Sequence, residues 1–326
     1  MARRGRPPAT GKPTTPADLV LTGAVARRHY IDRRTNVQIA DEFGLSRFQV
    51  ARMLDEARDR GWVRIEIDLP FHIDDALSLA VAERLGLERA VVVDAPEQSE
   101  AVTRDELARV IAALLESSVQ ADQVVGFAWS RAVVAMTGRL QSLPPCTVVQ
   151  LSGSLAVDGS EAGTVEVVRH VAAVSRGPLL PIYAPLIVPD ASTATSLIRR
   201  PEIARALSAA DRLDIAVIAI GAWADGASTV WPEVDPEVRE DVRRRGAVGE
   251  ASGRPFDADG NDVTGGFDDC VVGVTLDQLR RTPEVIATAY GANRAAAVQA
   301  AVQGGIVGTL VIDTTLARAI VEDVAD

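Results

Sequence analysis

The apolar positions of the chain follow one periodicity before about residue 70 and a different one after it. Residues 16–58 repeat apolar side chains every three to four positions, which is typical of helices that bury one face. Beyond residue 70, short apolar runs alternate with helical segments, as in a mostly parallel sheet covered by helices on both faces. The pattern predicts a helical domain over residues 16–69 and a doubly wound, Rossmann-like α/β domain over residues 70–326.

Strands of the larger domain are predicted where apolar runs are rich in β-branched residues, and helices where the apolar period is close to 3.6. The predicted strands or extended segments cover residues 89–93, 123–127, 147–151, 179–184, 215–220, 271–274, 285–290 and 309–312. The predicted helices cover residues 74–85, 104–120, 130–140, 163–175, 192–210, 294–303 and 314–322. Pro201 either interrupts the helix over residues 192–210 or begins a second one.

The segment from Thr35 to Arg58, TNVQIADEFGLSRFQVARMLDEAR, predicts two short helices joined by a tight turn. Gly44 lies at the turn, because glycine adopts a left-handed backbone without steric penalty. Ser46 begins the second helix, and Gln49 three residues later completes a capping box. The side chains expected to face each other between the helices are apolar: Ile39, Ala40, Phe43, Leu45, Val50 and Met53. This is the helix-turn-helix pattern, whose second helix enters the DNA major groove.

Side chains around the start of the second helix are the candidate DNA contacts. The predicted DNA-binding residues are Thr35, Ser46, Arg47, Phe48, Gln49 and Arg52. Arg47 and Gln49 are predicted base readers, because arginine pairs with guanine and glutamine with adenine through two hydrogen bonds. Arg52 either reads a base or anchors a phosphate, and Phe48 either contacts a thymine methyl group or packs locally. The alternative for the whole motif is an ordinary helical hairpin.

Segments on both sides of the motif add to this interpretation. A helix is predicted before it over residues 16–30, and the alternating residues 62–68 predict a strand after it, which suggests a small wing. Residues 1–15 form a basic arm that cannot fold alone, with Arg3, Arg4, Arg6 and Lys12 among Pro and Gly. This predicted disordered arm either reaches a minor groove or is merely a basic terminus.

The net charge of −11 at first argues against nucleic-acid binding, but the charge is unevenly distributed. Residues 1–68 carry 13 Lys and Arg against 9 Asp and Glu, whereas the remainder carries 21 against 36. An acidic remainder would be repelled by DNA and would help to orient the basic end toward it. The charge distribution therefore agrees with a DNA-binding domain at the N-terminal end.

Rare residue types limit the chemistry of the chain. Lys12 is the only lysine, so the folded part of the chain cannot form a lysine Schiff base. Cys146 and Cys270 are far apart and the three histidines are scattered, a distribution typical of reduced cysteines and not of a metal site. The chain lacks both an apolar run of about 18 residues and the apolar core of a signal peptide. We therefore predict a cytoplasmic protein without metal or cofactor.

Residues that follow the predicted strands are the candidate ligand site, because ligands bind at the carboxyl ends of the strands in sheets of this type. Gly126–Arg131 and Gly291–Arg294 each follow a strand and begin a helix, while Ser152–Ser154 and Gly221 follow two further strands. Serine, arginine and free N–H groups at such junctions can hold an anionic small molecule. The alternative is ordinary helix capping by Gly and Ser.

Several blocks, in order, resemble the SorC/DeoR-type family of bacterial sugar-binding transcriptional regulators. They are QIADEFGLSRFQVARMLDEARDRGWVRIEI, VVGFAWSRAV, VVQLSGSL, LLPIYAPLIV, GAVGEASGRPFDADG and VTLDQLRRTPEVIATAYGANRAAAVQAAVQGGIVGTLVID, within a resemblance from about Ala24 to the C-terminus. The resemblance implies an N-terminal helix-turn-helix and an effector domain similar to phosphosugar isomerases. It also implies homo-oligomers, often tetramers, and phosphorylated sugars or related polyols as inducers.

The same resemblance maps an effector site onto this sequence. The family's phosphate loop corresponds to Gly126–Ala132, its Gly-Gly loop to Ser152–Ser154, its late Gly-x-x-Lys to Gly291–Arg294, and its acidic position to Glu250. The predicted effector-binding residues are therefore Gly126, Trp129, Ser130, Arg131, Ser152, Gly153, Ser154, Glu250, Gly291 and Arg294. Ser130, Ala132 and Arg294 depart from the family pattern, so an unphosphorylated sugar or polyol is an alternative to a sugar phosphate.

These observations together predict a regulator of carbohydrate or polyol metabolism and not an enzyme. Its expected partners are a double-stranded operator, a small sugar, sugar phosphate or polyol, and further copies of itself as a dimer or tetramer. The effector would change DNA affinity by binding two states of the protein unequally. The rival interpretation is a sugar-phosphate isomerase-like enzyme with an appended helical module, in which Glu250 does acid–base work. A third is an oligomerising scaffold without a ligand.

Overall fold

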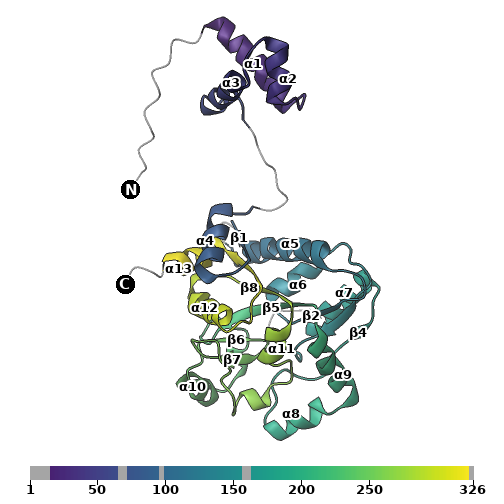
Figure 1. The fold of residues 1–326 in the computed structure, drawn as a ribbon. Coiled ribbons are helices and arrows are strands. Elements are labelled where there is room, and N and C mark those ends of the chain that lie inside the picture. Colours follow the sequence, from purple (N-terminus) through teal and green to yellow (C-terminus); the bar gives the residue numbers. More distant parts are fainter. Residues whose placement is uncertain (1–14, 65–71, 95–98, 156–162, 323–326) are drawn as a thin grey trace. The chain divides into compact units, whose positions relative to one another are not determined.

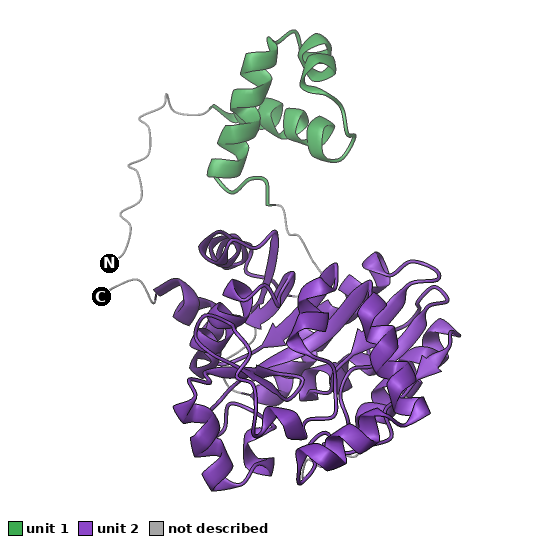
Figure 2. Cartoon of the chain, turned by 60° about the horizontal axis from the view of Figure 1, so that its bottom comes forward, with its two compact units in different colours: residues 1–69 green, residues 70–326 purple. Residues whose placement is uncertain are grey.

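A computed structural model describes residues 15–64, 72–94, 99–155 and 163–322 of the chain. It divides into unit 1, residues 1–69, and unit 2, residues 70–326, which are described separately (Figure 2). The predicted basic arm, apart from Thr15, and most of the predicted wing strand over residues 62–68 lie outside the described residues. Residues 62–64, which are described, contain no strand.

Unit 1 consists of three helices in its described part: α1 (Pro16–Tyr30), α2 (Asn36–Phe43) and α3 (Arg47–Asp59) (Figure 1). Thr15, Thr35 and Ser46 cap them, each accepting a hydrogen bond from the backbone N–H three residues later. Gly44 ends α2 with φ +67°, as the sequence predicted. The predicted facing residues all belong to the core of this unit, where they pack with Leu21, Val25, Ala26, Tyr30, Leu54 and Val63.

Unit 2 is built on a parallel sheet whose strand order is β1-β9-β8-β5-β2-β3-β4. The strands are β1 (Arg89–Val93), β2 (Val124–Phe127), β3 (Thr147–Gln150), β4 (Leu179–Leu180), β5 (Ile215–Ala222), β8 (Glu284–Ala289) and β9 (Thr309–Asp313). The short strands β6 (Gly249–Ala251) and β7 (Arg254–Phe256) form an antiparallel hairpin on β5.

Helices cover both faces of this sheet (Figure 1). They are α4 (Asp75–Leu85), α5 (Glu100–Ser118), α6 (Arg131–Thr137), α7 (Thr164–Ser175), α8 (Ala191–Ile198), α9 (Pro201–Ala209), α10 (Pro236–Arg244), α11 (Leu276–Arg281), α12 (Ala295–Gln303) and α13 (Thr314–Glu322). One core lies between the sheet and α4, α11, α12 and α13, and the other lies between the sheet and α5, α6 and α7. The doubly wound α/β prediction is therefore confirmed.

The predicted strand over residues 271–274 is wrong. This segment makes only isolated bridges, from Val271 to Ile187 and from Gly273 to Ser152. Its valines are buried, and the N–H groups of Val272 and Val274 donate to carbonyl groups of different segments. Burial and not regular pairing therefore explains the apolar run.

The order of the strands reverses between β2 and β5, which are neighbours in the sheet. From β2 the chain proceeds to β3 and β4 on one side, and from β5 it proceeds to β8 and β9 on the other. In a doubly wound sheet such a reversal leaves a crevice at the carboxyl ends of the strands.

In the part of the chain that the structure describes, every helix is too short or too polar to traverse a bilayer.

Candidate functional site

The beginning of α3 exposes two arginines that have no acidic partner among the described residues. Arg47, Phe48, Gln49 and Arg52 are all exposed, and the Phe48 side chain is 72% exposed. Phe48 therefore does not pack in the core of unit 1, but its ring lies 5.0 Å from the Arg47 guanidinium carbon. Other arginines of this unit, by contrast, are bound to carboxylates: Arg28, Arg34, Arg58 and Arg60. The positive charge at the start of α3 is thus available for an anionic partner.

The predicted capping box is formed, and it involves the side-chain amide of Gln49 that is proposed to contact a base. The Ser46 N–H donates to Gln49 Oε1 at 2.8 Å, and the Gln49 N–H donates to Ser46 Oγ at 3.2 Å. Adenine recognition uses both the oxygen and the nitrogen of the amide. The box uses one of the two lone pairs of Gln49 Oε1, so the other lone pair and the amide nitrogen remain for adenine. Thr35 likewise caps α2 together with Gln38.

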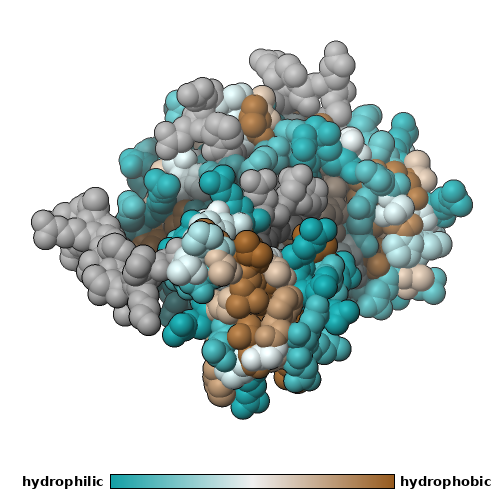
Figure 3. Space-filling view, turned by 90° about the horizontal axis from the view of Figure 1, so that it is seen from above, coloured by the Kyte–Doolittle hydropathy of each residue, from teal (hydrophilic) through white to brown (hydrophobic). Residues whose placement is uncertain are grey.

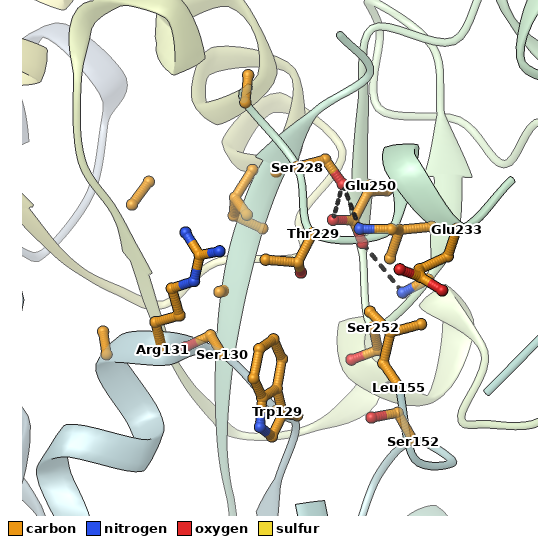
Figure 4. Close-up of a pocket in the computed structure, with 18 of the residues that line it drawn as sticks. Trp129, Ser130, Arg131, Ser152, Leu155, Ser228, Thr229, Glu233, Glu250 and Ser252 are labelled. Carbon is orange, nitrogen blue, oxygen red and sulfur yellow. Dashed lines mark hydrogen bonds between the residues drawn. The ribbon is translucent and has the colours of Figure 1, made fainter. Parts of the chain in front are cut away.

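A cavity of about 370 Å³ lies where the strand order of unit 2 reverses (Figure 4). Its lining comes from the loop after β2, the loops after β3 and β5, the β6–β7 turn and the end of β8. Seven of the ten predicted effector residues line it: Trp129, Ser130, Arg131, Ser152, Gly153, Glu250 and Arg294. Segments far apart in the sequence thus meet at one site, as the argument from strand ends predicted.

The other three predicted effector residues do not line this cavity. A Cβ atom at Gly126 would lie 2.5 Å from Leu151 Cδ2, so this glycine permits close packing within β2. Ser154 lines a neighbouring groove and exchanges backbone hydrogen bonds with the segment around Pro185. Gly291 has φ +84°, and its N–H donates to Asp313 Oδ1 at 3.0 Å. These residues shape the surroundings of the cavity and do not face it.

Replacing Gly126 with alanine is expected to lower the free energy of unfolding by about 1–3 kcal/mol, because the added methyl group overpacks a filled core. Urea unfolding of the full-length protein measures the effect. Gly138→Ala is the matched control, since its added Cβ atom meets nothing closer than 3.6 Å and its φ of −71° suits alanine. Equal stability of the Gly126→Ala variant and the wild type would contradict the packing role.

One side of the cavity is cationic. The Arg131 side chain is exposed and makes no hydrogen bond or ion pair with any described residue. Ser130 caps α6 by accepting a hydrogen bond from the Val133 N–H at 3.1 Å, which leaves its own hydroxyl proton free to donate. Ser130 therefore caps a helix, as the alternative to ligand binding predicted, but the same side chain can still bind a ligand.

Arg294 adds a second cation to the cavity, and it is half-buried. Its guanidinium donates to the carbonyl of Tyr290, to Asn293 Oδ1 at 3.1 Å and to the Gly226 carbonyl at 3.4 Å. It also lies 4.9 Å from the centroid of the Tyr290 ring. Burial lowers the pKa of Arg294, but an arginine stays charged, and no carboxylate among the described residues forms an ion pair with it. Glu100, Asp313 and Glu250 are close enough to act on its charge without pairing with it, so an anionic ligand could form the direct ion pair.

The other side of the cavity is acidic, as Figure 4 shows with Arg131 apart from Glu250 and Glu233. Glu250 is only 6% exposed, and burial raises the pKa of its carboxyl group. Its Oε1 accepts a hydrogen bond from Ser228 Oγ and its Oε2 accepts one from the Gly253 N–H, each at 3.0 Å. A Cβ atom at Gly221 would lie 2.3 Å from Glu250 Oε1, which explains the glycine near the end of β5.

Sequence reasoning missed part of the lining of the cavity. Residues not predicted include Asp225, Ser228, Thr229, Glu233, Ser252, Thr288 and Tyr290. Gly221 did indicate the correct strand end, but the contacting side chains lie several residues further along that loop. Within the described ranges, no group of three His, Cys, Asp or Glu side chains is arranged to hold a metal ion. The cavity thus offers cations, carboxylates and hydroxyl groups to a ligand.

Known proteins resemble this chain over nearly its whole length. The deoxyribonucleoside regulator of Bacillus subtilis is 28% identical over 307 residues, which cover 93% of this chain and 97% of that protein. The transcriptional regulator LsrR of Klebsiella pneumoniae subsp. pneumoniae is 28% identical and covers 93% of both chains. The crystal structure of the full-length sorbitol operon regulator SorC from Klebsiella pneumoniae has the same fold, with a TM-score of 0.68, 22% identity, and coverage of 94% of this chain and 99% of that one.

The family described as "Putative sugar-binding domain" matches residues 70–322, which is most of the chain and nearly all of unit 2. The matched segment contains every residue of the cavity lining. The resemblance inferred from the sequence blocks is confirmed by this match. The chain belongs to the sugar-binding domain family of SorC/DeoR-type regulators.

Proposed function

We propose that this chain is a DNA-binding transcriptional regulator whose operator affinity is controlled by a small sugar or polyol bound in the cavity. One observation carries the proposal: the cavity at the strand reversal is lined both by carboxylates, Glu250 and Glu233, and by two arginines, Arg131 and Arg294, that form no ion pair with the described residues. The relatives support it, since two of them are named a deoxyribonucleoside regulator and a sorbitol operon regulator. Unit 1 supplies a helix-turn-helix with two exposed arginines, Arg47 and Arg52, that have no carboxylate partner among the described residues and can bind the operator.

A phosphorylated sugar or polyol fits the charges of the cavity better than an unphosphorylated one. Its phosphate would bind Arg131 and Arg294, neither of which forms an ion pair with a carboxylate of the described residues. Its hydroxyl groups would donate to Glu250 or Glu233 on the opposite side. The volume of about 370 Å³ falls within the range of small-molecule sites, roughly 300–1,000 Å³.

Regulation is favoured over catalysis by the names of the relatives, which are regulators, and by the helix-turn-helix of unit 1. Glu250, the carboxylate of the rival acid–base interpretation, holds Ser228 and the β6–β7 turn through one hydrogen bond to each of its oxygens. We therefore propose that Glu250 binds a ligand hydroxyl and organises the loop, and that no turnover follows.

We further propose that the regulator is cytoplasmic and acts as a homo-oligomer on a palindromic operator, because paired recognition helices need two half-sites. Unit 1 offers a surface for a second copy. Large apolar side chains are exposed on α1 and just after it, namely Leu19, Val20 and Ile31, beside a groove of about 490 Å³ that reaches Trp62. Apolar residues gather into a patch among polar ones on the face shown in Figure 3.

Selection of duplexes from a random pool by the full-length protein tests this proposal. We expect a selected operator whose affinity falls by roughly 10³-fold or more between about 50 and 200 mM salt, because bound phosphates release counterions. At least one of glucose 6-phosphate, ribose 5-phosphate and glucitol 6-phosphate should change that affinity by about 5- to 150-fold. Failure to select any duplex, or an operator affinity that none of these ligands changes, would overturn the proposal. Turnover of a ligand would favour the isomerase-like alternative.

A further inference from the structure

We propose that Ser252 and Thr288 form, together with Glu250, a hydroxyl-recognition subsite that determines which sugars the cavity accepts. The inference rests on the proposed function. It adds how the ligand is oriented in the cavity and why the cavity selects one sugar over another. Each of the two hydroxyl-bearing residues is buried, lines the cavity and has no hydrogen-bond partner for its side-chain oxygen among the described residues.

Thr288 lies in β8, opposite Ala219 of β5 in the parallel ladder. Its side chain is 2% exposed, and its Oγ1 has no hydrogen-bond partner in the part of the chain that the structure describes. A buried hydroxyl group without a partner costs free energy, and most buried polar atoms in proteins are satisfied. Because Thr288 lines the cavity, a hydroxyl group of a bound ligand would satisfy its Oγ1.

Ser252 occupies the turn between β6 and β7 and has φ +54°, followed by Gly253 with φ +83°. A left-handed backbone at both positions is typical of a two-residue hairpin turn, where asparagine or glycine at the first position avoids most of the strain. The side chain of this serine is 8% exposed, and its Oγ also lacks a hydrogen-bond partner within the described ranges. Strained backbone with an unsatisfied buried group often marks a binding site. Figure 4 shows Ser252 on the side of the cavity opposite Arg131.

Glu250 completes the subsite and sets the direction of the ligand. Each of its carboxylate oxygens already accepts one hydrogen bond, so each keeps a further lone pair. A sugar hydroxyl can donate to Glu250 while it accepts from Ser252 or Thr288. A phosphate or carboxylate group in the same place would instead be repelled by Glu250. The hydroxylated end of the ligand thus faces these three residues, and its anionic end faces Arg131 on the opposite side of the cavity, with Arg294 as a second cation in the lining.

Such a subsite makes the cavity selective for the hydroxyl that it binds. A site built to hydrogen-bond a hydroxyl rejects the analogue that lacks it, because its own buried groups then remain unpaired. An apolar pocket discriminates much less between the same two molecules. The regulator should therefore distinguish a sugar phosphate from its deoxy analogue through Ser252 and Thr288.

Calorimetry with the full-length protein tests this assignment on three pairs of probes. They are glucose 6-phosphate, ribose 5-phosphate and glucitol 6-phosphate, each with its 2-deoxy analogue. We expect the wild type to prefer at least one hydroxylated probe over its analogue by about tenfold or more. Thr288→Val, which keeps the shape of the side chain, or Ser252→Ala should remove most of that preference. Affinity for the deoxy analogue should change little. Thr309→Val is the matched control, since Thr309 is buried in β9 and does not line the cavity.

The outcomes separate this assignment from the proposed function. If the wild type binds a hydroxylated probe and both variants keep its preference over the deoxy analogue, the subsite is wrong while the regulator stands. The subsite is also wrong if the wild type binds both members of each pair equally. If the wild type binds none of the six probes, the proposed function and the subsite are overturned together. Melting temperatures of the variants near that of the wild type confirm that they fold.

Discussion

The full-length Arg47→Ala variant is expected to bind its operator about 10- to 100-fold more weakly than the wild type, and to lose preference at one base pair. Arg47 is the first residue of α3, is exposed and has no carboxylate partner among the described residues, so its guanidinium is free to bind guanine. A bidentate contact of this kind discriminates against the wrong base by about 1–3 kcal/mol. Titration of the selected operator and of its single-base-pair variants measures both effects.

Arg58→Ala is the matched control on the same helix. Arg58 lies near the end of α3 and is bound to Asp55, and exposed pairs of this kind contribute little. We expect its removal to change operator affinity by less than about fivefold. If Arg47→Ala leaves both affinity and sequence preference unchanged, α3 does not read bases through its first turn. A uniform loss across all sequences would instead show that Arg47 contacts phosphate.

The fold was largely predictable because its elements are long and their apolar periods are clear. The capping box of α3 depends on Ser46 and Gln49 at a fixed spacing, so local sequence was sufficient to predict it. The β6–β7 hairpin was missed, because two strands of three residues each carry too few positions for an alternating pattern. The buried run Val271–Val274 was taken for a strand, because burial and strand pairing both favour valine.

The site was less predictable than the fold. Arg131, Glu250 and Arg294 could be placed, because they follow glycines at strand ends or match positions of the family. Gly126 was predicted with the loop that contains Arg131, but it permits close packing. That role depends on Leu151 and Leu213, which come from elsewhere in the chain. Unsatisfied hydroxyl groups leave no local signal in a sequence, since a partner can come from any part of the fold. Neither Thr288 nor the left-handed turn at Ser252 could therefore be inferred from neighbouring residues.

The Arg294→Met variant is expected to lose about 10- to 100-fold in affinity for whichever of the three phosphorylated probes the wild type binds, while affinity for the same compound without its phosphate stays nearly constant. Hydrogen bonds to charged groups contribute about 1.5–3 kcal/mol, and the partly buried position of Arg294 protects them from solvent. Methionine keeps much of the length and apolar surface of arginine, so the contact with the Tyr290 ring is largely preserved. Calorimetry measures the affinity of the variant for each of the two ligands. A general distortion of the cavity would weaken both ligands to a similar extent, so it would not change the ratio of the two affinities.

Two further variants test whether the loss of affinity is caused by the loss of the positive charge at residue 294. Arg294→Lys keeps a cation at the position where the family has lysine, so it should retain most of the preference for the phosphorylated ligand. Arg280→Met removes an arginine that is bound to Asp262 and Asp277 outside the cavity, and it should leave the preference unchanged. If Arg294→Met also leaves the preference unchanged, Arg294 does not bind the anionic end of the ligand, and the cation that selects phosphate lies elsewhere in the cavity, with Arg131 as the next residue to replace.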